Sequence, residues 1–266
     1  AKLLTIGAGI SLIGTAALVH YLLNVNWMVS FLVGSLLIAT GPTVIMPILK
    51  VVHVRERVAT ILETEGIVND VTAAILAIVF FEAILLNTTN IFDLIPIFIL
   101  KFGVGLLVGI LTALALINFL RLSFIPPSSA PQLTRLLVLM LALASYAISN
   151  SITPESGIVA AATAGIMLGN SSISYEREVS EFKGDITLLV LSFIFIILAA
   201  LLDLRILLSL GISGVLVVIL IIVLVRSLSV YASTTGTRFT LSEKIFMMAV
   251  APRGIIPASI SMLFAI

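Results

Sequence analysis

The sequence predicts an all-α membrane protein, a polytopic helical bundle of about nine spans. Hydrophobic residues make up 61% of the chain and charged residues 10%, whereas soluble domains average about 45–50% and about 25%. Long apolar runs recur along the chain, and a run of about 20 apolar residues is enough to cross a bilayer. Because the linkers are too short for a soluble domain, residues 1–266 are predicted to be one transmembrane domain.

The candidate spans follow from the apolar runs, with ends uncertain by about 2–4 residues. In chain order they are Leu3–Leu23, Trp27–Leu49, Val58–Leu86, Ile95–Leu120, Thr134–Ser149, Glu155–Gly169, Ile186–Leu202, Ile206–Val230 and Ser242–Ile266. The sixth run is short and rich in Ala and Gly, so we expect other helices to cover it. The charged stretch Ser174–Asp185 is predicted to be a solvated connector, and a pH-sensing role for it stays open.

The positive charges predict the orientation, because cytoplasmic loops carry an excess of Lys and Arg. If the N-terminal end is cytoplasmic, most of the 14 Lys and Arg residues fall on the cytoplasmic side. These are Lys2, Lys50, Arg55, Arg57, Arg121, Arg135, Arg177, Lys183, Arg226, Arg238 and Lys244. Arg205 falls outside, whereas Lys101 and Arg253 lie within spans. The first span therefore runs from inside to outside.

Composition also excludes several classes of function. A net charge of +1 with no large basic patch disfavours nucleic-acid binding. The absence of cysteine excludes disulfides, thiol catalysis and cysteine-held metal. The two histidines are far apart in the sequence, which disfavours a histidine metal cluster. The sequence also lacks a Ser/His/Asp or His/Glu arrangement of the kind found in hydrolases. We expect no cofactor.

Asp70 is the most informative residue, because it falls near the middle of the third span. An ionised carboxylate there costs about 2.5–3.5 kcal/mol on insertion scales, so such residues usually bind or move something. Glu63, Gly66 and Asp70 share one helical stripe. Gly66 leaves space beside the carboxylate, and Glu63 either lines a cytoplasmic funnel or is a solvated helix-end acid. The alternative interpretation is that Asp70 has a structural role and is hydrogen-bonded to neighbouring helices.

A helix break is predicted in the second span, at Gly41 and Pro42. Proline removes a backbone donor and clashes with the preceding turn. The carbonyls that are freed need protein, water or a cation as partners inside a membrane. Thr40 and Thr43 add hydroxyl oxygens next to the break. A simple proline kink, packed by neighbouring helices, is the alternative reading.

A second break is predicted in the last span, at Pro252, Gly254 and Pro257. Arg253 lies inside this break, and a buried guanidinium requires a carboxylate partner. The candidate partners in the third span are Glu63, Glu65 and Asp70. Two broken helices in separate halves of the chain, with a carboxylate at mid-depth, are typical of secondary transporters.

Three motifs in this order resemble the monovalent cation/proton antiporter family, in its sodium/hydrogen exchanger branch: TGPTVIMPILK, ETEGIVNDVTAAILAIVFFE and AVAPRGIIPASIS. The resemblance covers essentially the whole chain. It implies an inverted-repeat fold of about thirteen spans, of which this chain is a part. Spans before Ala1, a last span after Ile266 and a cytoplasmic regulatory domain are then expected outside it.

The resemblance also implies roles for individual residues. Asp70 resembles the carboxylate that binds cation and proton in turn, and Asn69 resembles its polar partner. Thr40 resembles the residue whose backbone carbonyl faces the ion. Glu65 and Arg253 resemble a buried structural ion pair.

Two positions depart from the pattern of many relatives. Gly41 stands where they have Asp, and Gly66 stands where they have a serine ligand. The predicted site therefore has fewer side-chain oxygens, so that water or carbonyl groups would complete it. This departure leaves the choice between Na⁺ and K⁺ open.

The predicted function is exchange of one monovalent cation, Na⁺ first, for one proton by alternating access at Asp70. A K⁺/H⁺ or nonselective exchanger is the nearest alternative. A cation channel and a cation sensor without transport are alternatives of another class. The expected setting is a homodimer in the plasma membrane of a prokaryote, with a role in pH homeostasis.

Overall fold

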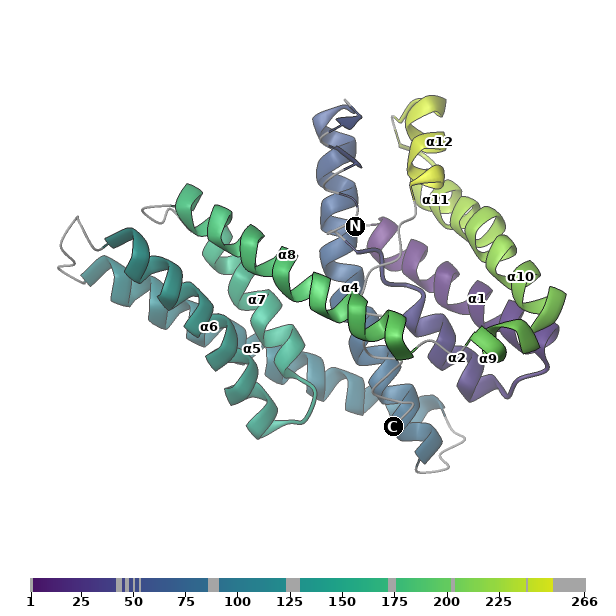
Figure 1. Ribbon diagram of the computed structural model, residues 1–266, viewed down its shortest axis with the longest axis horizontal. Helices are drawn as coiled ribbons and strands as arrows, with labels where there is room; N and C mark the ends of the chain where they lie inside the picture. The colour runs from purple at the N-terminus through teal and green to yellow at the C-terminus, as the bar shows by residue number, and fades with distance from the viewer. Residues whose placement is uncertain are drawn as a thin grey trace. The chain divides into compact units, whose positions relative to one another are not determined.

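The computed structural model describes residues 2–41, 45, 48–49, 51–52, 54–85, 91–122, 130–171, 176–201, 204–237 and 239–250. Every regular element in these ranges is helical (Figure 1). Five of the described helices are long and apolar enough to cross a membrane: Leu3–Leu23, Glu56–Leu85, Leu94–Leu120, Gln132–Ile152 and Gly211–Thr234. The predicted all-α class is confirmed.

The chain divides into two compact units. Unit 1 comprises Ala1–Leu94 and Leu198–Ile266, and unit 2 comprises Ile95–Ile197. Unit 1 therefore combines the two ends of the chain, whereas unit 2 is one continuous stretch. The predicted carboxylate site falls in unit 1.

Unit 1 begins with a helical hairpin. The π-helical segment η1 (Leu3–Gly7) continues into α1 (Ala8–Leu23), and α2 (Trp27–Leu36) follows. The Asn26 side chain caps α2 by accepting a hydrogen bond from Met28 N at 3.0 Å. At Gly34 an added Cβ would lie 2.8 Å from the Leu12 carbonyl oxygen, so only glycine permits this approach of α2 to α1.

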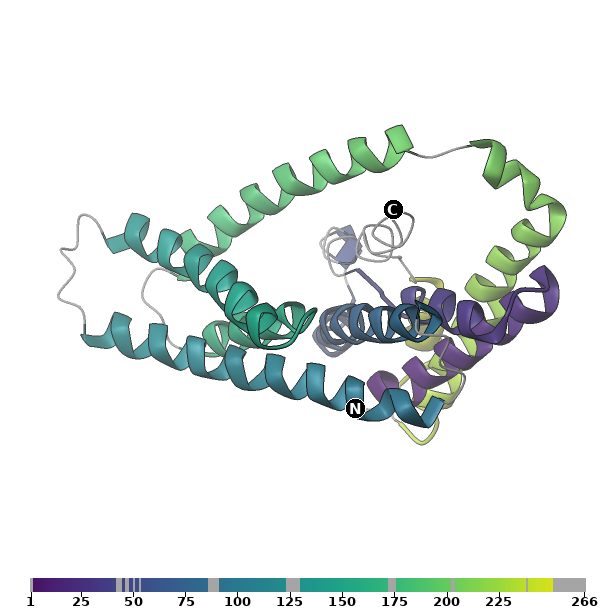
Figure 2. The ribbon, with the colours of Figure 1, turned by 90° about the horizontal axis from the view of Figure 1, so that it is seen from below.

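The helix α4 (Glu56–Leu85) packs against α2 and, with 30 residues, is the longest described element of unit 1. Figure 2 looks nearly along its axis. Its buried residues are mostly small or apolar, among them Ala73, Ala74 and Ala77, which permit close helix contact. A short 3₁₀ segment, η2 (Ile91–Asp93), follows α4. The polar positions Glu65, Asn69 and Asp70 are buried on the same helix.

The last part of unit 1 returns to the hairpin. A short helix, α9 (Leu204–Ser209), precedes a continuous run made of α10 (Gly211–Leu220), π-helical η3 (Ile221–Val225) and α11 (Arg226–Thr234). The Ser229 hydroxyl donates to the Gly7 carbonyl at 2.9 Å, which joins α11 to η1. A capping box of Thr240 and Glu243 begins α12 (Leu241–Ala249).

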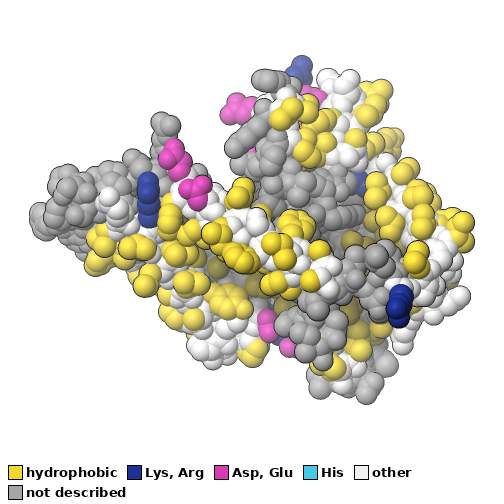
Figure 3. Space-filling model, viewed as in Figure 1, with side chains coloured by type: hydrophobic (Ala, Val, Ile, Leu, Met, Phe, Trp, Pro, Cys, Tyr) yellow, Lys and Arg dark blue, Asp and Glu magenta, His cyan; other side chains and the backbone are white. Residues whose placement is uncertain are grey.

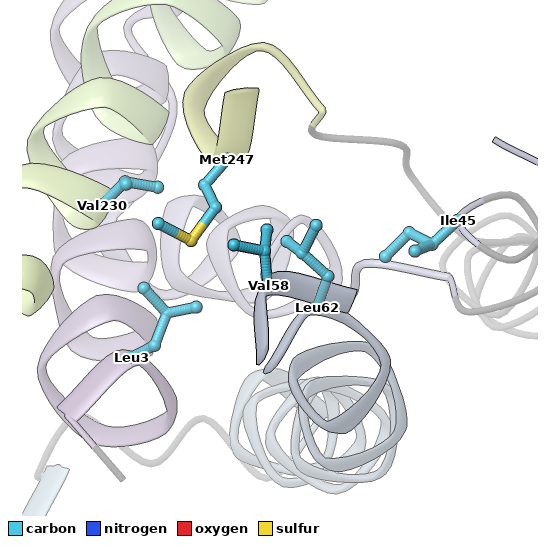
Figure 4. Close-up of a cluster of buried hydrophobic side chains, with 6 residues drawn as sticks. All are labelled: Leu3, Ile45, Val58, Leu62, Val230 and Met247. Atoms are coloured by element: carbon cyan, nitrogen blue, oxygen red, sulfur yellow. The ribbon is translucent and has the colours of Figure 1, made fainter. Parts of the chain in front are cut away.

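One apolar cluster joins these segments (Figure 4). It brings together residues from η1, α4, α11 and α12 with Ile45 of the second predicted span. These residues are Leu3, Val58, Leu62, Val230, Met247 and Ile45. Leu62 and Met247 have no exposed surface. The start of α4 is thereby fixed against α11 and α12, one turn from Glu65.

Unit 2 contains α5 (Leu94–Leu122), α6 (Ala130–Ile152), α7 (Gly157–Gly169) and α8 (Glu176–Leu201). The first three run side by side in Figure 1. An added Cβ at Gly105 would lie 2.5 Å from Val159 Cβ, and one at Gly109 would lie 2.5 Å from the Ala160 oxygen. The Gly105–Gly109 spacing therefore permits α5 to touch α7.

Several predicted spans agree closely with described helices, among them Val58–Leu86 with α4 and Ile95–Leu120 with the helix Leu94–Leu122, and two differ. The first predicted span coincides with η1 and α1. The second helix ends at Leu36 instead of Leu49, and α8 begins at Glu176 instead of Ile186. The predicted solvated connector is therefore mostly helix, because a charged helical extension gives no signal in a search for apolar runs.

The surface is rich in apolar side chains. Hydrophobic groups cover much of the described surface visible in Figure 3. Ile212, Val215 and Val218 on α10 are 84%, 59% and 55% exposed. Such exposure on long helices is expected where lipid, instead of water, is the solvent.

Candidate functional site

Asp70 lies halfway along α4 and is buried, with 6% of its surface exposed. Asn69 is exposed by 4%, and Gly66, one turn before Asp70, is also buried. Glu63, on the same stripe, is half-buried. The helix itself places the predicted polar residues, because α-helical spacing brings positions 63, 66 and 70 to one side.

The end of α2 supplies the other side of this site. Residues 39–41 are not helical, and Thr40 and Gly41 are buried. Ala39 packs in a cluster with Ile38, Ala8 and Ala73, and Ala73 is one turn after Asp70 on α4. The non-helical segment therefore crosses α4 next to the carboxylate, with the Thr40 backbone N–H facing Asp70.

Two oxygen atoms at this crossing lack partners. Asp70 Oδ1 and Thr40 Oγ1 are buried, and neither has a hydrogen-bond partner among the described residues. Buried polar atoms are almost always hydrogen-bonded, so an exception calls for an explanation such as a bound ion. A carboxylate oxygen and a hydroxyl oxygen are ligands that a hard cation accepts.

Glu65, one turn closer to the start of α4, is in a different situation. Arg226 Nη1 donates to Glu65 Oε1, and Arg226 Nη2 donates to Glu65 Oε2 at 3.2 Å. Arg226 Nε donates to the Met247 carbonyl at 3.2 Å, and Nη2 also reaches the Val250 carbonyl at 3.4 Å. Both side chains are buried, and their charges cancel.

Sequence resemblance implied Arg253 as the partner of Glu65. The described partner is Arg226, whereas Arg253 lies outside the described residues, so its pairing stays a prediction. Arg226, which the orientation count placed among the cytoplasmic charges, lies within the predicted span Ile206–Val230. It is buried on α11, where it pairs with Glu65.

A signal for Arg226 was available in the sequence. Arg226, Ser229 and Ser233 recur at helical spacing, and all three are buried on one side of α11. A polar stripe of this kind, directly after an apolar run, indicates that the helix continues and turns its polar side inward. The π-helical η3 immediately before Arg226 is a local distortion of the sort often found near functional residues.

Six predicted site residues lie outside the described residues: Pro42, Thr43, Pro252, Arg253, Gly254 and Pro257. Gly41 is placed, and its carbonyl accepts a hydrogen bond from Ile45 N at 3.4 Å. In the part of the chain that the structure describes, no group of three or more His, Cys, Asp or Glu side chains could hold a metal ion. Among the described residues, the charged side chain at the crossing is that of Asp70.

Residues 1–265 match the protein family described as the sodium/hydrogen exchanger, transmembrane. The chain belongs to the sodium/hydrogen exchanger family. As a member of this family with several apolar spans, it is a multi-pass integral membrane protein.

Among its relatives, this exchanger-family chain is 29% identical to Na(+)/H(+) antiporter 1 of Methanocaldococcus jannaschii, over 98% of the chain and 62% of that protein. It is 27% identical to the Na(+)/H(+) antiporter ApNhaP of Aphanothece halophytica, over 90% of the chain and 46% of that protein. The chain thus spans less than two thirds of each of these relatives.

A solved structure shares the fold. The sodium proton antiporter MjNhaP1 from Methanocaldococcus jannaschii at pH 8 superposes with a TM-score of 0.78 at 25% sequence identity. The match covers 98% of this chain and 66% of that chain. The exchanger-family chain therefore has the antiporter fold over its length.

Proposed function

We propose that the full-length protein is a cation/proton antiporter that exchanges Na⁺ for H⁺ at Asp70. The observation that carries the proposal is the contrast between the two buried acids of α4. Glu65 has a guanidinium on both of its oxygens, whereas Asp70 Oδ1 has no partner among the described residues. Asp70 is the acid whose charge is available to a transported ion. The Na(+)/H(+) antiporters among its relatives support Na⁺ and H⁺ as that pair of ions.

The ligands around Asp70 suit a monovalent cation. The Thr40 hydroxyl at the crossing has no partner among the described residues, and Asn69 is buried beside Asp70 on α4. A single carboxylate supplies one negative charge, so one Na⁺ would neutralise it. Thr43 would add a hydroxyl oxygen next to the helix break, and Gly66 would leave room for water.

Competition at one carboxylate couples the two ions. A proton on Asp70 removes the charge that attracts Na⁺, and bound Na⁺ disfavours protonation. Exchange of one Na⁺ for one H⁺ is electroneutral. For transport, unit 1 would alternate the access of this site between the two sides of the membrane. We expect the full-length protein to do so as a homodimer.

A K⁺/H⁺ or nonselective exchanger is the second candidate. It is favoured by Gly41 and Gly66, which give no side-chain oxygen at positions next to Thr40 and Asp70. Fewer fixed oxygens weaken the selection of one cation size over another. Selectivity has to be measured.

The test uses the full-length protein in sealed vesicles, with proton movement followed after addition of Na⁺, K⁺ or Li⁺. We expect Na⁺-dependent proton flux, and we expect Asp70→Asn to abolish it. Glu56→Gln is the matched control, because Glu56 is an exposed acid at the start of the same helix. Flux that survives Asp70→Asn would contradict the assignment.

The same assay separates the other classes. Cation flux that is independent of a proton gradient would indicate a channel. Binding of Na⁺ without any flux would indicate a sensor. Equal flux with K⁺ would favour the second candidate.

A further inference from the structure

Unit 2 contains a pocket that the proposed transport site does not use. It has a volume of about 280 Å³ and is lined by residues of α6, α7 and α8. Its walls are mainly apolar, with Leu141, Ala164, Phe182 and Ile186 among the lining residues. An apolar pocket between membrane helices is expected to hold hydrocarbon.

Two cationic side chains lie at this pocket. Arg135 reaches it from α6 and Lys183 from α8. Arg135 Nε is buried and has no hydrogen-bond partner among the described residues. Glu181 and Asp185 flank Lys183 in sequence but are not lining residues, because two positions along a helix turn a side chain by about 200°. The charged side chains among the described lining residues of the pocket are therefore both positive.

The cations are located at one end of the helices that carry them. Arg135 lies in the second turn of α6, and Lys183 lies about two turns into α8. Both helices begin after segments that the positive-inside rule assigns to the cytoplasmic side. The cations thus belong near the headgroup level of the cytoplasmic leaflet, and the apolar lining beyond them belongs in the hydrocarbon.

We propose that this pocket binds an anionic phospholipid of the cytoplasmic leaflet. One acyl chain would occupy the apolar pocket, and Arg135 and Lys183 would hold the phosphate. The orphaned Arg135 Nε would gain an acceptor, and a guanidinium is well suited to phosphate oxygens. A transported cation is disfavoured there by the two positive charges. Basic pockets between membrane helices on the cytoplasmic side commonly take anionic headgroups.

The first test counts bound lipids. The full-length protein is placed in nanodiscs of equal phosphatidylglycerol and phosphatidylcholine, and retained lipids are measured by native mass spectrometry. We expect phosphatidylglycerol to be retained in excess. The double variant Arg135→Gln/Lys183→Gln should lower that excess on the order of tenfold. Lys244→Gln, which removes a cation of unit 1, should leave it unchanged.

A second variant fills the pocket without touching the cations. Gly165 lines the pocket, and no atom lies within 4 Å of a Cβ added there, so Gly165→Leu has room to grow into it. We expect this variant to lose the retained phosphatidylglycerol. Gly169→Leu is the control, because a Cβ at Gly169 also has open space but Gly169 is not among the lining residues.

Three results would overturn the proposal. One is equal retention of both lipids by the unaltered protein. Another is undiminished phosphatidylglycerol in the double variant or in Gly165→Leu. The third is a disulfide between two copies of a Gly165→Cys variant, which would show that a second chain covers the pocket.

Discussion

At the residue scale, the two buried carboxylates on α4 have different neighbours and therefore different roles. Glu65 is neutralised by Arg226, whereas the Asp70 carboxylate faces the Thr40 N–H and has one oxygen without a described partner. Both acids are almost fully buried, so burial does not distinguish them. The distinction comes from the neighbouring segments: α11 supplies an arginine to Glu65, and the non-helical end of α2 lies against Asp70.

This difference predicts opposite effects of two similar substitutions on stability. Glu65→Gln leaves the Arg226 charge buried without a counter-charge, and we expect it to destabilise the protein by about 3–5 kcal/mol. Asp70→Asn removes a charge that has no cationic partner among the described residues, so it should leave stability unchanged or raise it. Thermal unfolding of the purified full-length protein measures both. Equal losses in the two variants would contradict the division of roles.

The Thr40 hydroxyl gives a second prediction. Thr40→Val keeps the shape of the side chain but removes the unpartnered Oγ1, so we expect a severalfold higher KM for Na⁺. Thr40→Ser retains the hydroxyl and should keep a KM close to that of the unaltered protein. Initial rates of Na⁺-driven proton movement give both values. A normal KM in Thr40→Val would remove the hydroxyl from the ligand set.

At the scale of the elements, glycines decide how closely helices approach in unit 2. Gly109 on α5 faces α7 so closely that an added Cβ would lie 2.5 Å from the Ala160 oxygen. Gly103 on the same helix has no atom within 4 Å of such a Cβ. The same substitution therefore meets backbone at one position and open space at the other.

We predict that substitution by alanine changes the free energy of unfolding in opposite directions at Gly103 and Gly109. Gly103→Ala should stabilise the protein by about 0.5–1 kcal/mol, because alanine loses less conformational entropy than glycine in a helix. Gly109→Ala should destabilise it, because α5 and α7 must separate. Thermal unfolding of each variant is the measurement. Stabilisation by Gly109→Ala would show that the α5–α7 contact is looser than described.

At the scale of the whole molecule, the proposed mechanism makes transport depend on pH through competition at one site. As the pH falls into the range where Asp70 takes up a proton, the apparent KM for Na⁺ should rise by about tenfold per pH unit, while the maximal rate changes less. Sodium-dependent flux measured over a series of pH values tests this. A KM that is independent of pH throughout would indicate separate sites for the two ions.

Much of this protein could be predicted from its sequence. Apolar runs predicted the membrane class, and the first span coincides with η1 and α1, because hydropathy reports directly on which segments lipid can solvate. Asp70 and Glu65 stood out because a carboxylate in an apolar helix is costly. The family motifs then indicated their roles.

Only the tertiary structure decided which groups meet. Glu65 takes Arg226, a residue 161 positions away, and nothing in either local sequence says which of several arginines will reach it. The cationic lining of the pocket between α6, α7 and α8 likewise depends on how three helices pack. Hydropathy is a property of one segment, whereas an ion pair or a pocket is a property of several segments at once, so the sequence determined the spans and the packing determined their partners.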